Sequence, residues 1–279
     1  MKRINNFNCL KPHTEDIIDK YINSGETITS LGVIYNVYAC SIHRLLKRNN
    51  VKIKDKSEIR RKYNVNSDYF KIIDSNEKAY FLGLLYADGN LSSTDYNVKI
   101  SLIVGDVSIL EKFKSNLNYD GQIKNIIYED KGFKNQKLLC ISNMYLHEDL
   151  IKLGCTPKKS LTLKFPSVHM VKEEFQSHFI RGYFDGDGSI FMKKSDKKES
   201  QRCVSFCGTE EFMTDIKRIL TSKCQLRNNE VHKHIKSNAF YYKVGGNLQV
   251  DRIFGYLYKD ANGLYLERKF NKFLKTNII

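Results

Sequence analysis

Two aspartates, Asp88 and Asp187, each close an apolar segment and stand directly before a glycine. Asp88 lies near the end of AYFLGLLYADGN, and Asp187 lies near the end of FIRGYFDGDGS. A glycine after such a run predicts the left-handed turn that ends a helix, so we expect both acids in a last helical turn. The C-terminus of a helix carries partial negative charge and repels a carboxylate by about 0.3 to 1 kcal/mol. We therefore expect a divalent cation close to these acids.

Small residues recur at a four-residue spacing inside both segments. Gly83 and Ala87 are four apart in the first, as are Gly182 and Gly186 in the second. Residues four apart share one face of a helix, and a glycine inside a helix costs about 1 kcal/mol relative to alanine. This cost is explained if the two helices pack along these small residues, which would bring Asp88 and Asp187 together.

Paired carboxylates point to metal-dependent hydrolysis. Two adjacent carboxylates raise each other's pKa unless an oxygen-binding cation such as Mg²⁺ or Mn²⁺ lies between them. Two such ions beside a phosphodiester activate water and stabilise the leaving oxygen. The metal ligands predicted at this site are Asp88, Asp187, Ala87 and Gly186. A structural alternative is that each Asp-Gly pair only ends a buried helix.

The elements around the two acids repeat along the chain. Leu110, Phe113 and Leu117 are echoed by Met213, Ile216 and Leu220, and Leu150 is echoed by Ile253. Between these helices, YNVKISLIV alternates apolar and polar residues, and RCVSF and AFYYKVGG occupy comparable places, as strands do. We expect an α+β fold of tandem repeats, residues 74–165 and 166–279, with a capping box at Asp74 to Glu77 opening the first helix.

The N-terminal residues predict a small all-α domain, residues 1–54. TEDIIDKYINSG, TITSLGVIYN and YACSIHRLLKRNN read as three short helices, the second opened by Thr27 or Thr29. The third places Ile42, Leu45 and Leu46 on one face and Arg44, Lys47 and Arg48 off it, as in a DNA-binding helix-turn-helix. A purely structural three-helix bundle would have the same apolar spacing. Residues 55–73 are polar and basic and read as a linker.

Composition favours a polyanionic partner. The 279 residues carry 46 Lys and Arg against 31 Asp and Glu, a formal net charge of +15. Such a charge attracts nucleic acid or an anionic membrane, and no apolar run is long enough to cross a bilayer. The seven cysteines are irregularly spaced, and the N-terminal residues lack the pattern of a secretion signal. We expect an intracellular protein, cytoplasmic or organellar or phage-encoded, rather than a secreted one.

The two motifs resemble the signature helices of the LAGLIDADG homing endonucleases: FLGLLYADG, residues 81–89, and IRGYFDGDG, residues 180–188. KKSLTLKFP (158–166) and YLYKDANGLYLERK (256–269) also look similar to the family. The N-terminal helices resemble an accessory domain of some members. The resemblance implies a pseudo-twofold monomer in which two antiparallel sheets form a saddle on duplex DNA.

The resemblance also implies site residues and a cofactor. Asp88 and Asp187 match the acids that bind Mg²⁺ or Mn²⁺, while the acid position before them is Asp185 in one motif and Tyr86 in the other. Lys243 and Lys99 are candidates for a lysine near the scissile phosphates. The residues predicted to bind DNA are Arg44, Lys47, Arg48, Arg60, Arg61, Lys99, Lys193, Lys194, Arg202, Lys233 and Lys236.

Two other functions are compatible with the same residues. A transcription regulator could keep this fold and its helix-turn-helix without the chemistry, although retention of both acids argues against that. An intron maturase could use the basic surface to bind folded RNA, since phosphate attraction is common to RNA and DNA.

Overall fold

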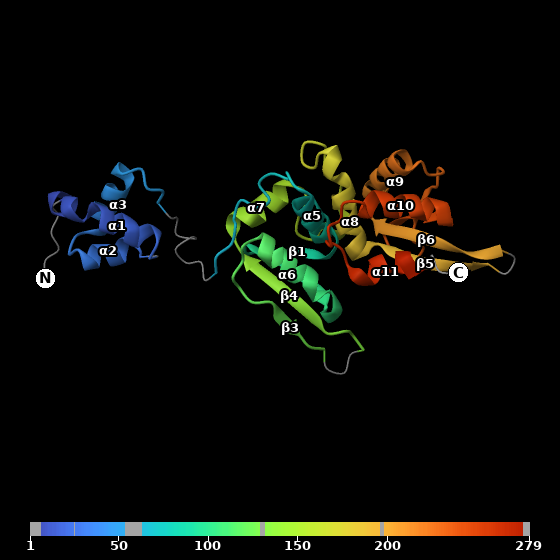
Figure 1. Ribbon diagram of the computed structural model, residues 1–279, viewed down its shortest axis with the longest axis horizontal. Helices are drawn as coiled ribbons and strands as arrows, with labels where there is room; N and C mark the ends of the chain where they lie inside the picture. The colour runs from blue at the N-terminus through green and yellow to red at the C-terminus, as the bar shows by residue number, and fades with distance from the viewer. Residues whose placement is uncertain (1–6, 25, 54–62, 129–131, 196–197, 276–279) are drawn as a thin grey trace. The chain divides into compact units, whose positions relative to one another are not determined.

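The computed structural model describes residues 7–24, 26–53, 63–128, 132–195 and 198–275 (Figure 1). The chain divides into two compact units, residues 1–62 and residues 63–279. Each unit has its own cluster of buried apolar side chains, so each is described separately.

The first unit is helical. It contains a 3-10 helix η1 (Phe7–His13) and the helices α1 (Thr14–Ile22), α2 (Ile28–Ile34) and α3 (Ala39–Arg48). Thr27 opens α2 through a capping box with Ser30, in which each side chain bonds the other residue's main-chain N–H. Ile42, Leu45 and Leu46 of α3 are buried in the core of this unit. The three predicted helices are confirmed.

The second unit consists of two repeats with the same order of elements: helix, strand, strand, helix, strand, strand, helix. The first repeat comprises α5 (Asn76–Asp88), β1 (Gly89–Leu91), β2 (Asn97–Ile103), α6 (Val107–Asn116), β3 (Lys124–Ile126), β4 (Gln136–Ser142) and α7 (Met144–Lys152). The second comprises α8 (Gln176–Asp187), β5 (Ser189–Ser195), β6 (Lys198–Gly208), α9 (Glu210–Cys224), β7 (Val231–Lys233), β8 (Phe240–Gly245) and α10 (Asn247–Tyr258). Short 3-10 helices, η2 (Val104–Asp106), η3 (Lys159–Leu161) and η4 (Glu173–Phe175), lie between these elements, and α11 (Glu267–Lys275) follows α10.

Each repeat builds one antiparallel sheet of the same topology. The strand orders are β1-β2-β4-β3 and β5-β6-β8-β7. In β2, Val98, Ile100 and Leu102 are buried while the residues between them are partly exposed, which confirms the predicted alternation. The helices α6 and α7 pack on the first sheet, and α9 and α10 pack on the second. The fold is α+β, with one face of each sheet left free of these helices.

The repeated core positions fulfil equivalent roles. Leu110, Phe113 and Leu117 are buried at α6, and Met213, Ile216 and Leu220 are buried on α9. Leu150 on α7 and Ile253 on α10 are buried as well. The two repeats therefore match not only in their order of elements but also in the side of each helix that faces the core.

Two predictions about boundaries are wrong. Residues 63–73 were assigned to a linker, but Tyr69, Phe70 and Ile73 are buried in the core of the second unit. Tyr69 and Phe70 interrupt the polar composition of this segment, and burial of their rings explains why it packs on the second unit. At the start of α5 the N-cap is Ser75, whose hydroxyl accepts from Lys78 N, rather than Asp74, which forms an ion pair with the Lys78 side chain.

Candidate active site

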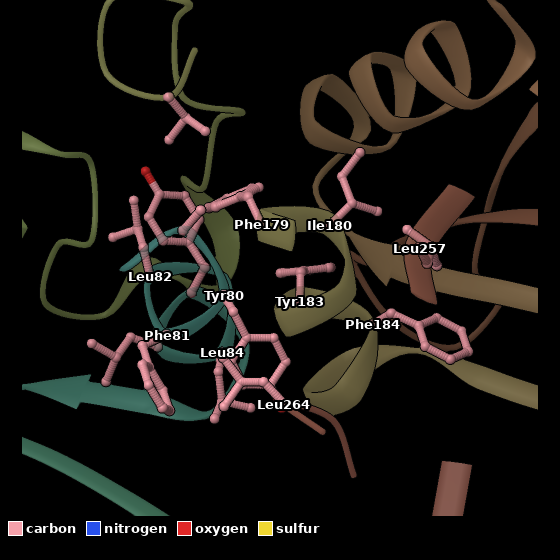
Figure 2. Close-up of a cluster of buried hydrophobic side chains, with 14 of the residues drawn as sticks. Tyr80, Phe81, Leu82, Leu84, Phe179, Ile180, Tyr183, Phe184, Leu257 and Leu264 are labelled. Carbon is pink, nitrogen blue, oxygen red and sulfur yellow. The ribbon is translucent and has the colours of Figure 1, made fainter. Parts of the chain in front are cut away.

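The helices α5 and α8 pack directly against each other between the two sheets, as Figure 1 shows. A Cβ atom on Gly83 would overlap the carbonyl oxygen of Phe179, and one on Gly182 would overlap the carbonyl oxygen of Tyr80. Only glycine permits this approach of the two backbones. Large side chains on either side, including Phe81, Leu84, Ile180 and Phe184, fill the surrounding core (Figure 2).

The close approach continues to the C-terminal ends of the two helices. A Cβ on Gly186 would overlap that of Ala87 and lie 3.0 Å from Asp88 Oδ2. The small-residue seam of Gly83, Ala87, Gly182 and Gly186 therefore runs along the interface, as expected, and ends at Asp88 and Asp187. Both aspartates are exposed to solvent.

The two carboxylates influence each other. Protein atoms crowd each of them on the sides turned away from solvent and remove part of its hydration. This loss, together with the negative charge of Asp187, raises the pKa of Asp88 to about 6. Loss of hydration also raises the pKa of Asp187, and the positive charges of Lys269 and Lys159 oppose that rise. The site therefore concentrates negative charge that nearby cations only partly compensate.

Two buried lysines hold the ends of the motif helices. Lys159, 8% exposed, donates to the carbonyl oxygen of Gly89 after α5. Lys269, 6% exposed, donates to the carbonyl oxygens of Phe184, Gly186 and Gly188 at 2.7, 2.9 and 2.7 Å at the end of α8. Neither lysine was predicted as a site residue, although they lie in the segments KKSLTLKFP and YLYKDANGLYLERK. Each follows the last helix of the seven-element series, which is the signal that could have found them.

The glycines after the motif helices have a different role from the one predicted. Gly89 and Gly188 have φ of −74° and −87°, not the left-handed conformation, because the chain passes straight into β1 and β5. A Cβ on Gly89 would overlap the carbonyl oxygen of Leu85, and one on Gly188 would overlap the ring of Phe184. Glycine is required here by lack of space.

The residues before the motif aspartates contribute to packing. Asp185 is fully buried, and its Oδ2 accepts from Tyr80 OH at 2.8 Å and from Leu266 N at 2.9 Å. Its pKa is raised to about 6 by burial. Tyr86, at the equivalent position of α5, donates its hydroxyl to the carbonyl oxygen of Leu153. The difference between the motifs therefore concerns how each helix is anchored.

Lys99 and Lys243 lie on corresponding rungs of the two sheets. Lys99 on β2 pairs with Asn90 and Cys140, and Lys243 on β8 pairs with Ser205, which itself pairs with Ser189. Asn90 and Ser189 each follow a motif aspartate by two residues. Both lysines are partly exposed, and Lys243 Nζ rests 4.8 Å from the centre of the Phe191 ring. Their predicted catalytic role stays a prediction.

The residues predicted to bind DNA fall into three groups. Arg44, Lys47 and Arg48 are exposed on α3, and Lys193, Lys233 and Lys236 are exposed on or beside β5 and β7. Arg60, Arg61 and the side chain of Lys194 lie outside the described residues. The prediction that Arg202 binds DNA is wrong. Arg202 is 4% exposed and forms an ion pair with Asp251 at 2.7 Å, because β6 turns this side chain toward α10. Its guanidinium is not presented to a ligand.

The candidate metal ligands are few and consist of oxygen atoms. Within the described residues, no group of three or more His, Cys, Asp or Glu side chains is placed to hold a metal ion. Ala87 and Gly186 can contribute only main-chain carbonyl oxygens, and that of Gly186 already accepts from Lys269. Two carboxylates with carbonyl oxygens beside them form a donor set that suits Mg²⁺ or Mn²⁺.

None of the described helices has the length and apolar character needed to cross a membrane.

No family model matches the chain. Among curated proteins of Methanocaldococcus jannaschii, an uncharacterized protein is 28% identical over 181 residues, which are 63% of this chain and 64% of that protein. DNA-directed RNA polymerase subunit Rpo1C is 34% identical over 116 residues, 40% of this chain and 12% of the subunit. A probable translation initiation factor IF-2 is 24% identical over 209 residues, 71% of this chain and 16% of the factor. The chain thus spans less than two thirds of the length of each of these relatives.

Several solved structures are similar to this chain. The I-LtrWI LAGLIDADG homing endonuclease bound to target DNA is 14% identical with a TM-score of 0.46, covering 76% of this chain and 91% of that one. The LAGLIDADG meganuclease I-CpaMI bound to uncleaved DNA is 14% identical with a TM-score of 0.47, covering 72% and 90%. The LAGLIDADG homing endonuclease I-GzeII in complex with its DNA target is 12% identical with a TM-score of 0.47, covering 71% and 88%.

Proposed function

We propose that this chain is a site-specific endonuclease of the LAGLIDADG homing type, which hydrolyses one phosphodiester in each strand of duplex DNA. One observation carries the proposal: the glycine-lined packing of α5 and α8 brings Asp88 and Asp187 together at an exposed end of the interface. The two signature motifs and the net charge of +15 support the same function. Since both motifs belong to one chain, the active form is a monomer.

The donor set at the helix ends suits a divalent cation. Asp88 and Asp187 would hold Mg²⁺ or Mn²⁺, together with the carbonyl oxygen of Ala87. Such an ion would supply Lewis-acid activation of water and would neutralise charge at the scissile phosphate. The pKa of Asp88 is raised by loss of hydration and, to a smaller extent, by the negative charge of Asp187, and a bound cation would oppose both effects.

The protein's own side chains perform the remaining tasks. Lys159 and Lys269 fix the ends of the motif helices and bring positive charge close to both carboxylates. This charge favours the approach of a phosphate to a site that is otherwise negative. The helix-free faces of the two sheets, with Lys99, Lys193 and Lys243, would bind the DNA backbone and read bases in the major groove. The exposed basic residues of α3 would add contacts outside the cleavage site.

Cleavage of a randomised library of duplex targets tests the proposal. With Mg²⁺ we expect the wild type to cut a defined target, and Asp88→Asn or Asp187→Asn to reduce the rate at least about a hundredfold. Asp215→Asn removes an acid from α9 away from this site and should leave the rate unchanged. Equal cleavage by the wild type and the Asp88→Asn/Asp187→Asn double variant would contradict the proposal.

The same experiment separates the other two functions. Sequence-specific binding without metal and without cleavage would indicate a transcription regulator. Tighter binding to a folded host intron RNA than to any duplex DNA would indicate a maturase.

A further inference from the structure

Asp106 is a buried carboxylate that does not cap its own helix. It occupies the N-cap position of α6, where an aspartate normally accepts from a main-chain N–H of the first turn. No such bond forms here, although the residue is only 4% exposed. Its Oδ2 instead accepts from Arg268 Nε at 2.8 Å. A buried charge needs a partner, and Arg268 provides it across the interface between the two repeats.

Arg268 stands beside Lys269 in a segment that leaves the second repeat and crosses to the first. We name residues 263–269 the C-terminal strap. Lys112 of α6 donates to the carbonyl oxygen of Gly263 at 2.6 Å, and Leu266 N donates to Asp185 at 2.9 Å. The strap is therefore held by both repeats, and Lys269 lies directly after the residue that Asp106 binds.

The segment that carries Lys159 is held in an equivalent way. Thr209 is the N-cap of α9, at the position that corresponds to Asp106 in the other repeat. Its hydroxyl donates to the carbonyl oxygen of Leu163 at 2.5 Å, while Lys164 pairs with Glu211 at 3.0 Å. Each lysine-bearing segment is thus attached to the start of the second helix of the opposite repeat.

We propose that Asp106 is a positioning residue that holds Lys269 at the end of α8 by binding Arg268. Thr209 performs the corresponding task for Lys159 by binding Leu163. The carboxylate of Asp106 does not touch the reacting atoms and acts only through the strap. The consequence for catalysis depends on the proposed endonuclease function, whereas the placement of Lys269 does not.

Chemical labelling of the two lysines tests the placement. We would expose the full chain to a brief pulse of acetic anhydride and quantify acetylation of Lys269 and Lys159 by mass spectrometry. Asp106→Ala should raise the ratio of Lys269 to Lys159 labelling about fivefold or more, since the strap opens more often when its buried ion pair is lost. Thr209→Ala should change the same ratio in the opposite direction.

Additional variants separate positioning from general loss of structure. Arg268 is 45% exposed in its side chain, so Arg268→Gln leaves no cavity in the core and should raise the ratio as Asp106→Ala does. In the double variant Asp106→Ala/Arg268→Gln, the labelling ratio should rise no further than in the single variant with the larger effect. Asp106→Glu should restore much of the wild-type ratio. Asp215→Ala breaks an exposed ion pair with Arg218 on α9 and should leave the ratio unchanged.

Strand-resolved cleavage tests the catalytic consequence. With a mapped target in a supercoiled plasmid, Asp106→Ala should slow one strand about tenfold and leave the other within a factor of about two, so nicked plasmid accumulates. Its affinity for DNA should not change. If the wild type does not cleave at all, the proposed function fails and the labelling ratio still decides the placement. Unchanged ratios in both Asp106→Ala and Arg268→Gln would overturn the inference.

Discussion

Lys159 and Lys269 satisfy carbonyl oxygens that a helix leaves unpaired at its C-terminus. The last turn of a helix has no intrahelical donors for its carbonyl groups, and its partial negative charge favours a cation by about 0.3 to 1 kcal/mol, more when partly buried. Each lysine ends one motif helix in this way. The positive charges also compensate part of the repulsion that the motif aspartates would otherwise experience.

Replacing Lys269 should therefore affect both stability and chemistry. Lys269→Gln removes the donor from three carbonyl oxygens, and leaving such groups unsatisfied costs about 1 to 3 kcal/mol. Cleavage should also slow at least about tenfold while DNA affinity changes little, because the lost charge acts on Asp88 and Asp187, where we propose that the reaction takes place. Urea denaturation and single-turnover cleavage measure the two effects. Lys152→Gln, at an exposed lysine on α7, is the control, and equal behaviour of the two variants would refute this role.

His178 makes the stability of the chain depend on pH. It is 5% exposed, and Arg181 Nη1 donates to its Nδ1 at 2.9 Å, so the ring must be neutral at that atom. Burial and the charge of Arg181 lower the pKa of His178 from 6.5 to about 4. Because the unfolded chain takes up this proton first, stability falls as pH decreases from 6.5 toward 4. Between pH 7 and pH 5 the loss is about 2 kcal/mol.

The variant His178→Asn isolates this contribution. Its amide oxygen can still accept from Arg181 but does not titrate. Asp88 and Asp185, with pKa values raised to about 6, act in the opposite direction and affect both proteins equally. Between pH 7 and pH 5, the free energy of unfolding of the wild type should fall by about 2 kcal/mol relative to that of the variant. A pH-independent difference would contradict the neutral, buried histidine.

At the scale of helices and strands, the glycines of α5 and α8 set the distance between the repeats. Gly182→Ala places a methyl group against the carbonyl oxygen of Tyr80, a main-chain atom that cannot move without shifting α5. We expect a loss of about 1 to 3 kcal/mol or more in the free energy of unfolding. Gly255 is also inside a helix, α10, but a Cβ there meets no atom within 4 Å. Gly255→Ala should stabilise the protein by up to about 1 kcal/mol.

Thermal denaturation of the two variants compares them directly. The two variants should change the free energy of unfolding in opposite directions because of packing alone, since both substitutions improve helix propensity equally. If Gly182→Ala were neutral or stabilising, the backbones of α5 and α8 would not approach as closely as described. Gly182→Ala should also lower the cleavage rate, because the displaced helices would separate Asp88 from Asp187.

Local sequence patterns predicted the elements because each depends on nearby residues. The period-two alternation of β2 and the repeated apolar positions of α6 and α9 were sufficient to place these elements and their buried sides. Failures occurred where long-range packing decides. Gly89 and Gly188 looked like left-handed helix ends, but the chain continues directly into β1 and β5, which pair with β2 and β6 farther along the chain. Residues 63–73 looked polar, but three buried side chains attach them to the body.

In the candidate site, too, the features that depend on nearby residues were predicted and those that depend on distant residues were not. Asp88 and Asp187 and the seam that joins them were readable because both features repeat within single helices. Lys159 lies 70 residues from Gly89, whose carbonyl oxygen it binds, and no local pattern links the two. Lys99 and Lys243 were favoured because they alternate on strands, yet the lysines whose charges act on the aspartates are Lys159 and Lys269. Arg202 was counted with the basic surface because its partner Asp251 is 49 residues away.

For the whole molecule, the two units have separate cores, and each unit presents exposed basic residues. The second unit contains the pseudo-twofold arrangement and the paired acids, so the proposed cleavage belongs to it. Asp88, Asp187 and the two lysines beside them all belong to the second unit, whereas the first unit presents Arg44, Lys47 and Arg48 from α3, whose opposite side is buried. Its contribution should therefore be to affinity and not to the chemical step.

The triple variant Arg44→Ala/Lys47→Ala/Arg48→Ala tests this division of tasks in the full chain. If all three side chains contact phosphates, the slope of log affinity against log salt concentration should decrease by about 0.9 for each lost contact, up to about 3. Single-turnover cleavage at saturating DNA should stay within a factor of about two of the wild type, because Asp88 and Asp187 are untouched. The matched control, Lys152→Ala/Arg218→Ala/Lys223→Ala, removes the same charge from α7 and α9, which cover the sheets. Equal slopes for the two triple variants would show that α3 contributes only net charge, whereas a smaller slope for the α3 variant alone would locate DNA contacts on this helix.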